Sequence, residues 1–509
     1  MRIEQFLDFS AQTLREKVAL SCDGQSWTFG TLQRACRALA HALNEYVTNN
    51  QRIAIILENS VETVISIYGT LLAGCTFVVL GTDTKPAVLI SILNDCEASA
   101  LITNIPRLHR IRDSLTSLPH LKAVFIISGS GELPQYNFPT IVSFHEAIEK
   151  YGDVCAAGVQ RLDSDPAAIV YTSGSTGQPK GVILSHLNVH YTTTTIASYL
   201  GNTHDDVILG MLPLHHTYGL TQLLTASYVG ATLILQRAFT HAHAALATIA
   251  DQRVTGFAVV PAIAKALLEV DVTSYDLSSL RYITNAAAAL PLATTHKLRE
   301  SLPHVRLFLM YGLTECMRAS FLPPDQVDAR PTSVGRGLLN QKTYIIDEHG
   351  APVPSGTIGE LVISGPNVMQ GYWRRPLETD NALRAGPLGE KMLYTGDLFT
   401  MDEQGYLYFV SRKDDIVNTC GEKVSLQEIE EVLCSLPGVS DAAVFGVPDT
   451  NLGHALKAII QLDQGSVLNR RELFRHCAKH LEPYKVPTFI EFGSIPKTPN
   501  GKTEKRKLK

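Results

Sequence analysis

The segment Tyr171–Val182 combines glycines, serine and threonine hydroxyls and a single lysine. Glycines let successive backbone N–H groups turn toward one anion, and hydroxyls and a lysine add donors and charge that suit phosphate. The apolar run Ala167–Val170 before it predicts a buried strand, and the apolar spacing of Ile183–Val189 after it predicts a helix. The segment therefore predicts a triphosphate cradle. Its expected phosphate-binding residues are Thr172, Ser173, Gly174, Ser175, Thr176, Gly177 and Lys180.

The order of residues in this segment excludes two common phosphate loops. A Walker loop needs serine or threonine directly after its lysine, but Gly181 follows Lys180, and no Gly-x-Gly-x-x-Gly opens a dinucleotide site. A plain surface turn is the alternative, yet turns rarely combine so many donor side chains with a lysine. The segment resembles the phosphate loop of the adenylate-forming superfamily of acyl-CoA synthetases, luciferases and nonribosomal adenylation domains. Among these, it is most similar to stand-alone acyl- or aryl-CoA ligases.

A second group of polar residues follows the apolar run that ends at Tyr311. Thr314 and Glu315 come directly after it, at the carboxyl end of a predicted strand, where α/β sheets bind ligands. A tyrosine ring can stack on adenine, a threonine hydroxyl can bond a phosphate, and a glutamate can hold Mg²⁺. The resemblance implies these roles for Tyr311, Thr314 and Glu315.

The resemblance implies further nucleotide contacts. Ala287 stands where the family often has a glycine beside adenine and the acyl group, although an alanine run alone is typical of a helix start. Asp397, expected in a tight turn after a strand, would accept the ribose hydroxyls, and Arg412 would contact the nucleotide. Gly371–Trp373 also matches the family pattern.

The acid-binding side carries fewer signals. His216 lies in a Pro-Leu-x-His segment that resembles the family's carboxylate pocket, and a structural histidine is the open alternative. Its neighbour His215 does not make a metal site, because no third ligand is visible. Met317 and Arg318 are candidates for lining the acid pocket, and Arg318 could instead be a surface cation.

The C-terminal part resembles the mobile domain of the family. Asp414 matches the hinge, Gly421 would let a pantetheine arm pass the backbone, and Lys502 matches the adenylation lysine. Asn418 stands where lysine is usual, so no nucleotide contact is assigned to it. We expect residues 1–412 to bind adenylate and acid, and residues 413–509 to form the mobile domain.

Strands and helices that alternate along the chain predict an α/β fold with largely parallel sheets flanked by helices, and a small α+β C-terminal domain. Expected strands are 52–57, 76–80, 100–103, 123–128, 307–311, 442–447 and 455–462. Expected helices are 36–43, 64–74, 426–433 and 471–481.

Composition narrows the class of protein. Of the 509 residues, 45% are hydrophobic and 18% charged, and the formal net charge of -5 gives no reason to expect nucleic acid. The nine cysteines are scattered without a Cys-x-x-Cys pair, which fits reduced thiols in a cytoplasmic protein. Neither a signal peptide nor a membrane span is expected, and the oligomeric state is undetermined.

The predicted reaction has two steps and uses ATP, Mg²⁺ and a thiol. A carboxylic acid, fatty or aromatic, forms an acyl-adenylate, and CoA or the phosphopantetheine of a separate carrier protein then takes the acyl group. Phe239 is followed by no acidic residue that could hold an α-amine, which argues against an α-amino acid. Two rival hypotheses are a non-catalytic adenylate-binding relative and luciferase-like oxidation. The presence of Lys502, Glu315 and Asp397 opposes the first, and no residue points to oxygenation.

Overall fold

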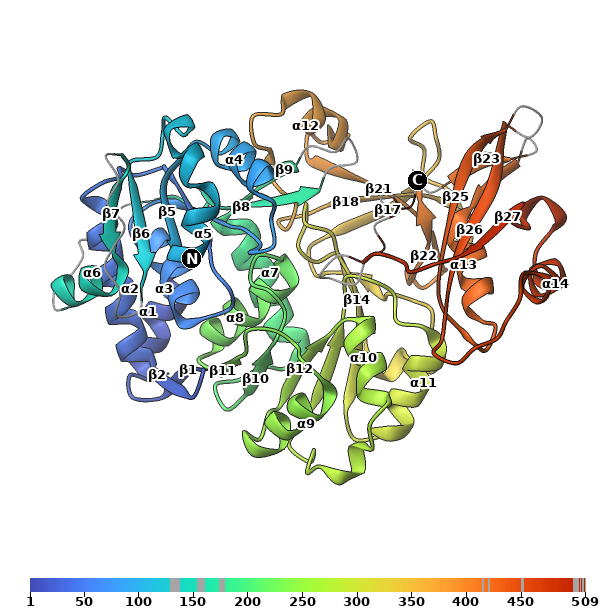
Figure 1. Cartoon of the computed structure of the whole chain (residues 1–509), viewed down its shortest axis with the longest axis horizontal. Helices are drawn as coiled ribbons and strands as arrows, with labels where there is room; N and C mark the ends of the chain where they lie inside the picture. Colours follow the sequence, from blue (N-terminus) through green and yellow to red (C-terminus); the bar gives the residue numbers. More distant parts are fainter. Residues whose placement is uncertain are drawn as a thin grey trace.

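The fold is described from a computed structural model of the chain (Figure 1). It describes residues 1–128, 138–152, 161–173, 179–413, 416–419, 422–449 and 453–497, together with Thr503, Lys505 and Leu508. Two sheets with flanking helices and a third, antiparallel sheet form the large N-terminal part. A small C-terminal domain lies beside them, at the right of Figure 1.

The first sheet has eight strands in the order β19-β9-β8-β4-β3-β5-β6-β7. Strands β4, β3, β5, β6 and β7 are parallel, and their runs of buried aliphatic residues are typical of a sheet covered on both faces. The strands are β3 (Arg52–Ile56), β4 (Thr76–Val79), β5 (Ala98–Asn104), β6 (Ala123–Ile127), β7 (Thr140–Ser143), β8 (Pro166–Ser173), β9 (Pro179–Ser185) and β19 (Gly371–Tyr372). The helices of this region are α1 (Glu4–Thr13), α2 (Phe29–Asn44), α3 (Val61–Leu72), α4 (Pro86–Asp95), α5 (Ile105–Ile111) and α6 (Phe144–Tyr151).

The second sheet has nine strands in the order β16-β15-β14-β13-β12-β10-β11-β1-β2. Strands β14, β13, β12, β10, β11 and β1 are parallel, so their carboxyl ends share one edge. The strands are β1 (Val18–Cys22), β2 (Gln25–Thr28), β10 (Val207–Gly210), β11 (Thr232–Leu235), β12 (Gly256–Val259), β13 (Tyr282–Asn285), β14 (Arg306–Tyr311), β15 (Ser320–Leu322) and β16 (Arg336–Gly337). The helices are α7 (His186–Leu200), α8 (Thr217–Val229), α9 (Ala242–Asp251), α10 (Pro261–Leu268) and α11 (Leu292–Ser301).

The third sheet is antiparallel and adjoins the C-terminal domain. Its strands are β17 (Lys342–Ile346), β18 (Gly359–Ser364), β20 (Leu383–Ala385), β21 (Lys391–Met401) and β22 (Leu407–Arg412), with α12 (Pro376–Ala382) before β20. The C-terminal elements are β23 (Ile416–Thr419), β24 (Glu422–Ser425), α13 (Leu426–Cys434), β25 (Val439–Asp449), β26 (Gly453–Leu462), α14 (Arg470–His480) and β27 (Phe489–Phe492).

The C-terminal domain has a hydrophobic core of its own. Ile429, Leu433, Ile460 and Leu473 are fully buried in it and belong to α13, β26 and α14. This separate core fits a domain that folds as a unit. The α/β fold with a small C-terminal domain is thus confirmed, and each expected strand and helix named above lies within or overlaps an observed one.

One expected helix is wrong at its start. Residues Pro179–Ser185 form the strand β9, which pairs antiparallel with β8, so the predicted phosphate loop joins two strands of a hairpin. Val182 and Leu184 are fully buried against the sheet. The helix α7 begins only at His186, where the side chains of Ser185 and Asn188 form a capping box.

No helix among the described residues is long and apolar enough to cross a membrane.

Candidate active site

The predicted phosphate loop begins and ends on a fixed hairpin. Thr172 lies opposite Lys180 on the two strands. Tyr171 Oη donates a hydrogen bond of 2.5 Å to Asp95 Oδ2, and Trp373 N donates one of 2.7 Å to Gly181 O. These contacts hold the ends of the loop against α4 and β19. Of the predicted phosphate ligands, Gly174, Ser175, Thr176 and Gly177 lie outside the described residues, and only the backbone of Ser173 is described.

Tyr372 connects the hairpin to the second group of predicted residues. β19 pairs with β9, which places Tyr372 opposite Val182. The Lys180 Nζ lies 5.4 Å from the centre of the Tyr372 ring, within cation–π range. On its other side, Tyr372 Oη donates a hydrogen bond of 2.8 Å to Glu315 Oε1. The sequence pattern Gly371–Trp373 marked this segment, but we did not predict Tyr372 as a site residue.

A tight loop after β14 presents Thr314 and Glu315, which are both half-buried. Ala319 N donates to Tyr311 O at 2.9 Å, so the loop returns to the strand that it leaves. A Cβ on Gly312 would lie 2.6 Å from Met317 O, too close for any other residue. The loop therefore depends on glycine here, and the two polar side chains stand at the carboxyl end of β14, as predicted.

Asp397 faces Tyr311 across the site. Tyr311 Oη donates a hydrogen bond of 2.6 Å to Asp397 Oδ2, and Arg412 Nε lies 3.2 Å from Oδ1. Burial, and next the neighbouring Asp397 charge, raise the pKa of Tyr311 well above its usual range, so its hydroxyl stays protonated and a donor. The carboxylate, an arginine and an aromatic ring are thus brought together.

Asp397 does not lie in a turn, as we expected, but inside β21. The backbone of Gly396 has φ +70°, and the β18–β21 pairing shifts its register between Glu360 and Val362. Residues 395–397 therefore bulge out of the β18–β21 ladder, while Asp397 still pairs with Arg412 of β22. Glu360 stabilises the bulge by accepting a hydrogen bond of 3.1 Å from Gly396 N.

The same Glu360 reaches the start of the C-terminal domain. Lys413 Nζ donates a hydrogen bond of 2.7 Å to Glu360 Oε2, directly after Arg412 at the end of β22. The predicted hinge Asp414 and the predicted thiol-passage residue Gly421 lie outside the described residues. In the backbone register of the β23–β24 hairpin, Asn418 lies opposite Lys423.

The C-terminal tail packs on its own domain. Lys497 and Thr503 form an isolated bridge, and Lys505 Nζ lies 2.9 Å from Glu430 Oε1 of α13. The predicted adenylation residue Lys502 lies outside the described residues. Across the domains, Lys265 Nζ of α10 lies 3.8 Å from Asp463 Oδ1.

His216 caps the N-terminus of α8. Its backbone N donates to Pro213 O at 3.1 Å, and its ring centre lies 4.0 Å from that of His215. Asn59 fixes the segment before it, because its side chain donates to Leu212 O and accepts from Leu214 N. Nowhere in the described part of the chain do three His, Cys, Asp or Glu residues gather as a group that could hold a metal ion.

Ala287 lies in a loop after β13 and not in a helix, since α11 begins only at Leu292. Its φ is +73°, a left-handed conformation that favours glycine. A glycine would adopt this conformation without the steric cost that an alanine has.

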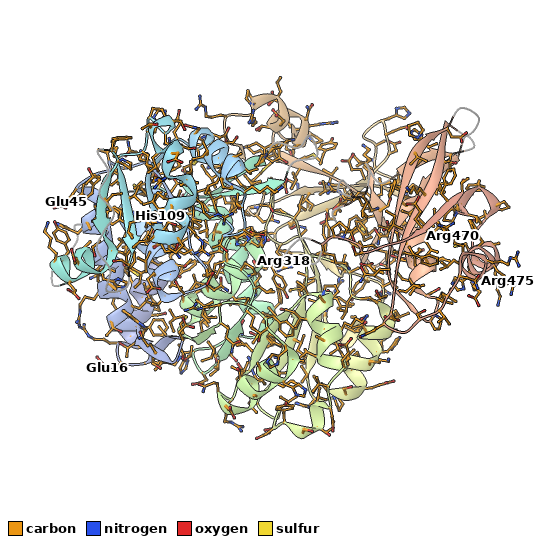
Figure 2. The ribbon with its side chains drawn as sticks, viewed as in Figure 1. Glu16, Glu45, His109, Arg318, Arg470 and Arg475 are labelled. Carbon is orange, nitrogen blue, oxygen red and sulfur yellow. The ribbon has the colours of Figure 1, made fainter. Side chains whose placement is uncertain are left out.

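Arg318 is not a surface cation. It is only 2% exposed, and by volume it is the largest of the buried side chains among the described residues. Figure 2 labels its position. Its Cζ lies 5.3 Å from the centre of the Tyr218 ring, on the first turn of α8. Arg318 therefore packs against the first turn of α8, the helix whose N-cap residue is His216.

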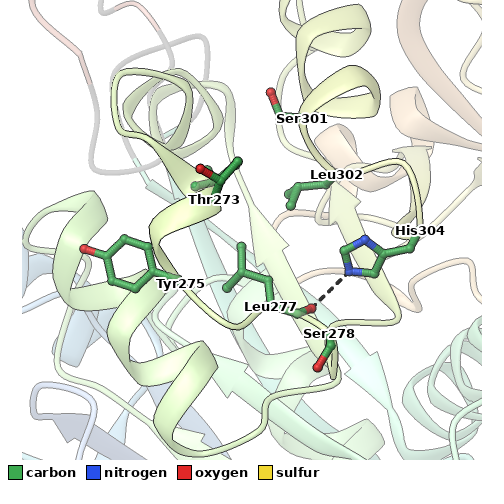
Figure 3. A pocket seen from close by; sticks show the side chains of 8 residues that line it. Thr273, Tyr275, Leu277, Ser278, Ser301, Leu302 and His304 are labelled. Carbon is green, nitrogen blue, oxygen red and sulfur yellow. Dashed lines mark hydrogen bonds between the residues drawn. The ribbon is translucent and has the colours of Figure 1, made fainter.

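A surface hollow of about 430 Å³ lies elsewhere, between the segments that follow α10 and α11 (Figure 3). His304 Nε2 donates a hydrogen bond of 3.0 Å to Leu277 O at its edge. None of its lining residues is a predicted site residue and none is acidic, so we assign the site to the convergence of β8, β9, β14 and β21 instead.

Comparisons with known proteins show the family of the chain. The family model described as AMP-binding enzyme matches residues 7–373, and that of the AMP-binding enzyme C-terminal domain matches residues 428–502. A long-chain-fatty-acid–CoA ligase of Bacillus subtilis (strain 168) is 30% identical, over 99% of this chain and 94% of that protein.

Solved structures agree over the full length. Anthranilate CoA ligase AuaEII in complex with anthranoyl-AMP superposes with a TM-score of 0.89 at 28% identity, covering 100% of this chain and 96% of that one. ATP-bound MatB from Rhodopseudomonas palustris gives 0.90 at 27% identity, covering 100% and 98%. The chain therefore belongs to the AMP-binding enzyme family and to the adenylate-forming superfamily that its sequence predicts.

Proposed function

We propose that the protein is an AMP-forming acid–thiol ligase that activates a fatty or aromatic carboxylic acid and transfers it to CoA. The observation that carries the proposal is the continuous chain of contacts Lys180–Tyr372–Glu315, joined through the β14 loop to Tyr311 and Asp397. It connects a phosphate-binding hairpin to a carboxylate pair suited to a metal and a ribose. The CoA ligase named above as a relative, and the anthranoyl-AMP complex, support this reading.

The nucleotide would lie along this chain of contacts. Asp397 would accept the ribose hydroxyls, Tyr311 and the backbone of Ala287 would pack against adenine, and Arg412 would face the phosphates or ribose. Thr314 would donate to the α-phosphate. The residues from Thr172 to Lys180 would hold the pyrophosphate as it leaves, because backbone N–H groups and a lysine suit an anion.

Mg²⁺ would accompany ATP, and Glu315 fits it. Mg²⁺ in nucleotide sites binds through one or two carboxylates and the phosphates and keeps several waters. Glu315 is half-buried and its Oε1 already accepts a hydrogen bond from Tyr372, which orients the carboxylate. When bound, the ion would neutralise charge on the phosphates.

In the first step, a carboxylate oxygen attacks the α-phosphorus, the bond to the bridging oxygen breaks, and pyrophosphate leaves. Lys502 would bridge the acid and the α-phosphate, where charge develops in the transition state. His216, at the start of α8, would contact the acid.

In the second step, the thiol of CoA attacks the acyl carbon, loses its proton, and AMP leaves. We propose that residues 413–509 rotate about Asp414 between the steps, which withdraws Lys502 and brings Gly421 to the site. The contact between Lys413 and Glu360 would break and reform during this rotation, since it lies at the junction of the two parts.

Pyrophosphate exchange over a panel of fatty and aromatic acids tests the proposal. Exchange with at least one acid, followed by AMP release that depends on CoA, is the expected result. An absence of exchange with every acid would contradict the ligase. Exchange without CoA-dependent AMP release would favour the alternative acceptor, a separate carrier protein.

A further inference from the structure

Arg318 is a buried charge without a counter-charge. Among the described residues it forms no ion pair, and its buried Nε has no hydrogen-bond acceptor. Arginine is almost never fully buried unless it is paired, because removal of an ion from water is costly. The proposed nucleotide site does not use it. The fold thus holds a cation in place for which the described protein supplies no anion.

The surroundings of Arg318 are aromatic and neutral. Its guanidinium faces the ring of Tyr218, and the hydroxyl of Tyr199 lies beside it. Burial raises the pKa of Tyr199 to about 12, with Arg318 acting in the opposite direction. Burial also raises the pKa of Tyr218. Both hydroxyls therefore stay protonated at neutral pH, so neither tyrosine can balance the charge.

The position of Arg318 connects the Glu315 loop to the start of α8. It follows Glu315 by three residues, and its Cα would lie 2.9 Å from a Cβ on Gly312, so its backbone closes the loop that presents Glu315. Tyr218 follows His216 by two residues on α8. The phosphate-binding Lys180 lies instead on the other sheet, beside Tyr372. Arg318 thus packs on the helix that begins at the predicted acid contact His216, and the described residues show no contact between Arg318 and Lys180.

We propose that the acid is a dicarboxylic acid, on a fatty or aromatic skeleton, and that Arg318 binds the carboxylate that does not react. A planar guanidinium can grip a carboxylate with two parallel hydrogen bonds, and a desolvated pair of this kind is strong. Binding would supply the missing counter-charge at the moment when substrate enters. The inference rests on the proposed ligase function and names the chemical class of its substrate.

The test compares matched acids in pyrophosphate exchange with the full-length protein. Straight-chain dicarboxylic acids of three to ten carbons and benzene dicarboxylic acids are paired with their monomethyl esters, which keep the size but lose the second charge. We expect kcat/KM for the best diacid to exceed that of its half-ester about 100-fold or more, because a site built for a polar group rejects the analogue that lacks it.

Two variants locate the effect. Arg318→Met keeps an unbranched apolar stem but removes the guanidinium, and it should lower kcat/KM for the diacid about 100-fold while sparing or raising the half-ester. Arg318→Lys keeps the charge and should retain part of the preference. Arg253→Met is the matched control, because Arg253 is an exposed arginine that pairs with Asp276, and it should leave the preference unchanged.

The outcomes separate the two proposals. A wild-type enzyme that uses half-esters or monocarboxylic acids as well as diacids overturns the role of Arg318, while the ligase function stands. An absence of exchange with all acids contradicts the function itself. If Arg318→Met does not fold, the wild-type comparison of diacid with half-ester still decides the inference.

Discussion

The nucleotide side and the acid side of the site differ in how their polar groups are paired. On the nucleotide side, Glu315 accepts from Tyr372, and Asp397 accepts from Tyr311 and lies beside Arg412. On the acid side, Arg318 is buried against Tyr218 with no carboxylate partner among the described residues.

The difference indicates that the nucleotide side sets the rate with every acid and that the acid side sets the preference among acids. Paired groups are held in place before any ligand arrives, and such preorganisation serves chemistry that is the same for every acid. A buried charge without a counter-charge is instead stabilised only by a ligand of opposite charge. Changes on the nucleotide side should therefore slow all acids alike, and changes on the acid side should alter their ranking.

Lys502→Ala should give the largest effect, because this residue is proposed to touch both sides. We expect pyrophosphate exchange to fall about 1,000-fold or more with every acid, since a charge that acts only in the transition state is lost. Thioester formation from a supplied acyl-adenylate should be largely spared. The exposed Lys479→Ala is the control and should match the wild type in both assays. Equal loss of both steps would argue against the rotation of residues 413–509.

Glu315→Gln should lower exchange about 100-fold with all acids, through weaker binding of Mg²⁺. The shape of the side chain is kept, and Tyr372 can still donate to its oxygen. Titration of Mg²⁺ should show a higher requirement in this variant. Tyr372→Phe, which keeps the carboxylate and removes only its donor, should have a smaller effect. A variant slowed with one acid and normal with another would contradict the division between the two sides.

Asp397→Asn should raise KM for ATP about tenfold and leave KM for the acid unchanged, because a charge-assisted hydrogen bond is weakened. The wild type should discriminate ATP from 2′-deoxy-ATP, and the variant should discriminate less. If the wild type and the variant discriminate equally between ATP and 2′-deoxy-ATP, Asp397 does not bind the ribose 2′-hydroxyl. An effect on acid preference would mean that the two sides are not separable.

The sequence was sufficient for the parts of the fold whose signals are local. Apolar runs marked β3, β5 and β14, and the Tyr311-Gly312 pair marked the end of β14 and the loop that follows it. Such features depend on residues near each other in the chain, so periodicity and turn chemistry reveal them.

Features that depend on distant partners were missed or wrong. Whether Pro179–Ser185 forms a strand depends on its pairing with β8 and β19, and a short apolar run alone does not distinguish strand from helix. Tyr372 lies 57 positions from Glu315, and no local pattern connects them. The burial of Arg318 follows from the packing of Tyr199 and Tyr218 from other elements, so the sequence could not decide between an acid-pocket residue and a surface cation.

Ala287→Gly should give the smallest effect, and it tests a backbone position between the two sides. The φ of +73° costs an alanine about 1–2 kcal/mol, and glycine relieves this strain. Glycine also has more freedom in the unfolded chain, which costs about 0.5–1 kcal/mol. The net expectation is a stabilisation of up to about 1 kcal/mol in urea unfolding, with acid preference unchanged.

The neighbouring residue supplies the control for this prediction. Ala286 is 3% exposed and has no positive φ, so Ala286→Gly should destabilise through lost packing and added freedom of the unfolded chain. If Ala287→Gly raises the free energy of unfolding and Ala286→Gly lowers it, the backbone conformation at residue 287 causes the difference. The exchange of alanine for glycine alone would change both in the same direction. If both variants destabilise the protein equally, the left-handed backbone conformation does not strain the alanine at position 287.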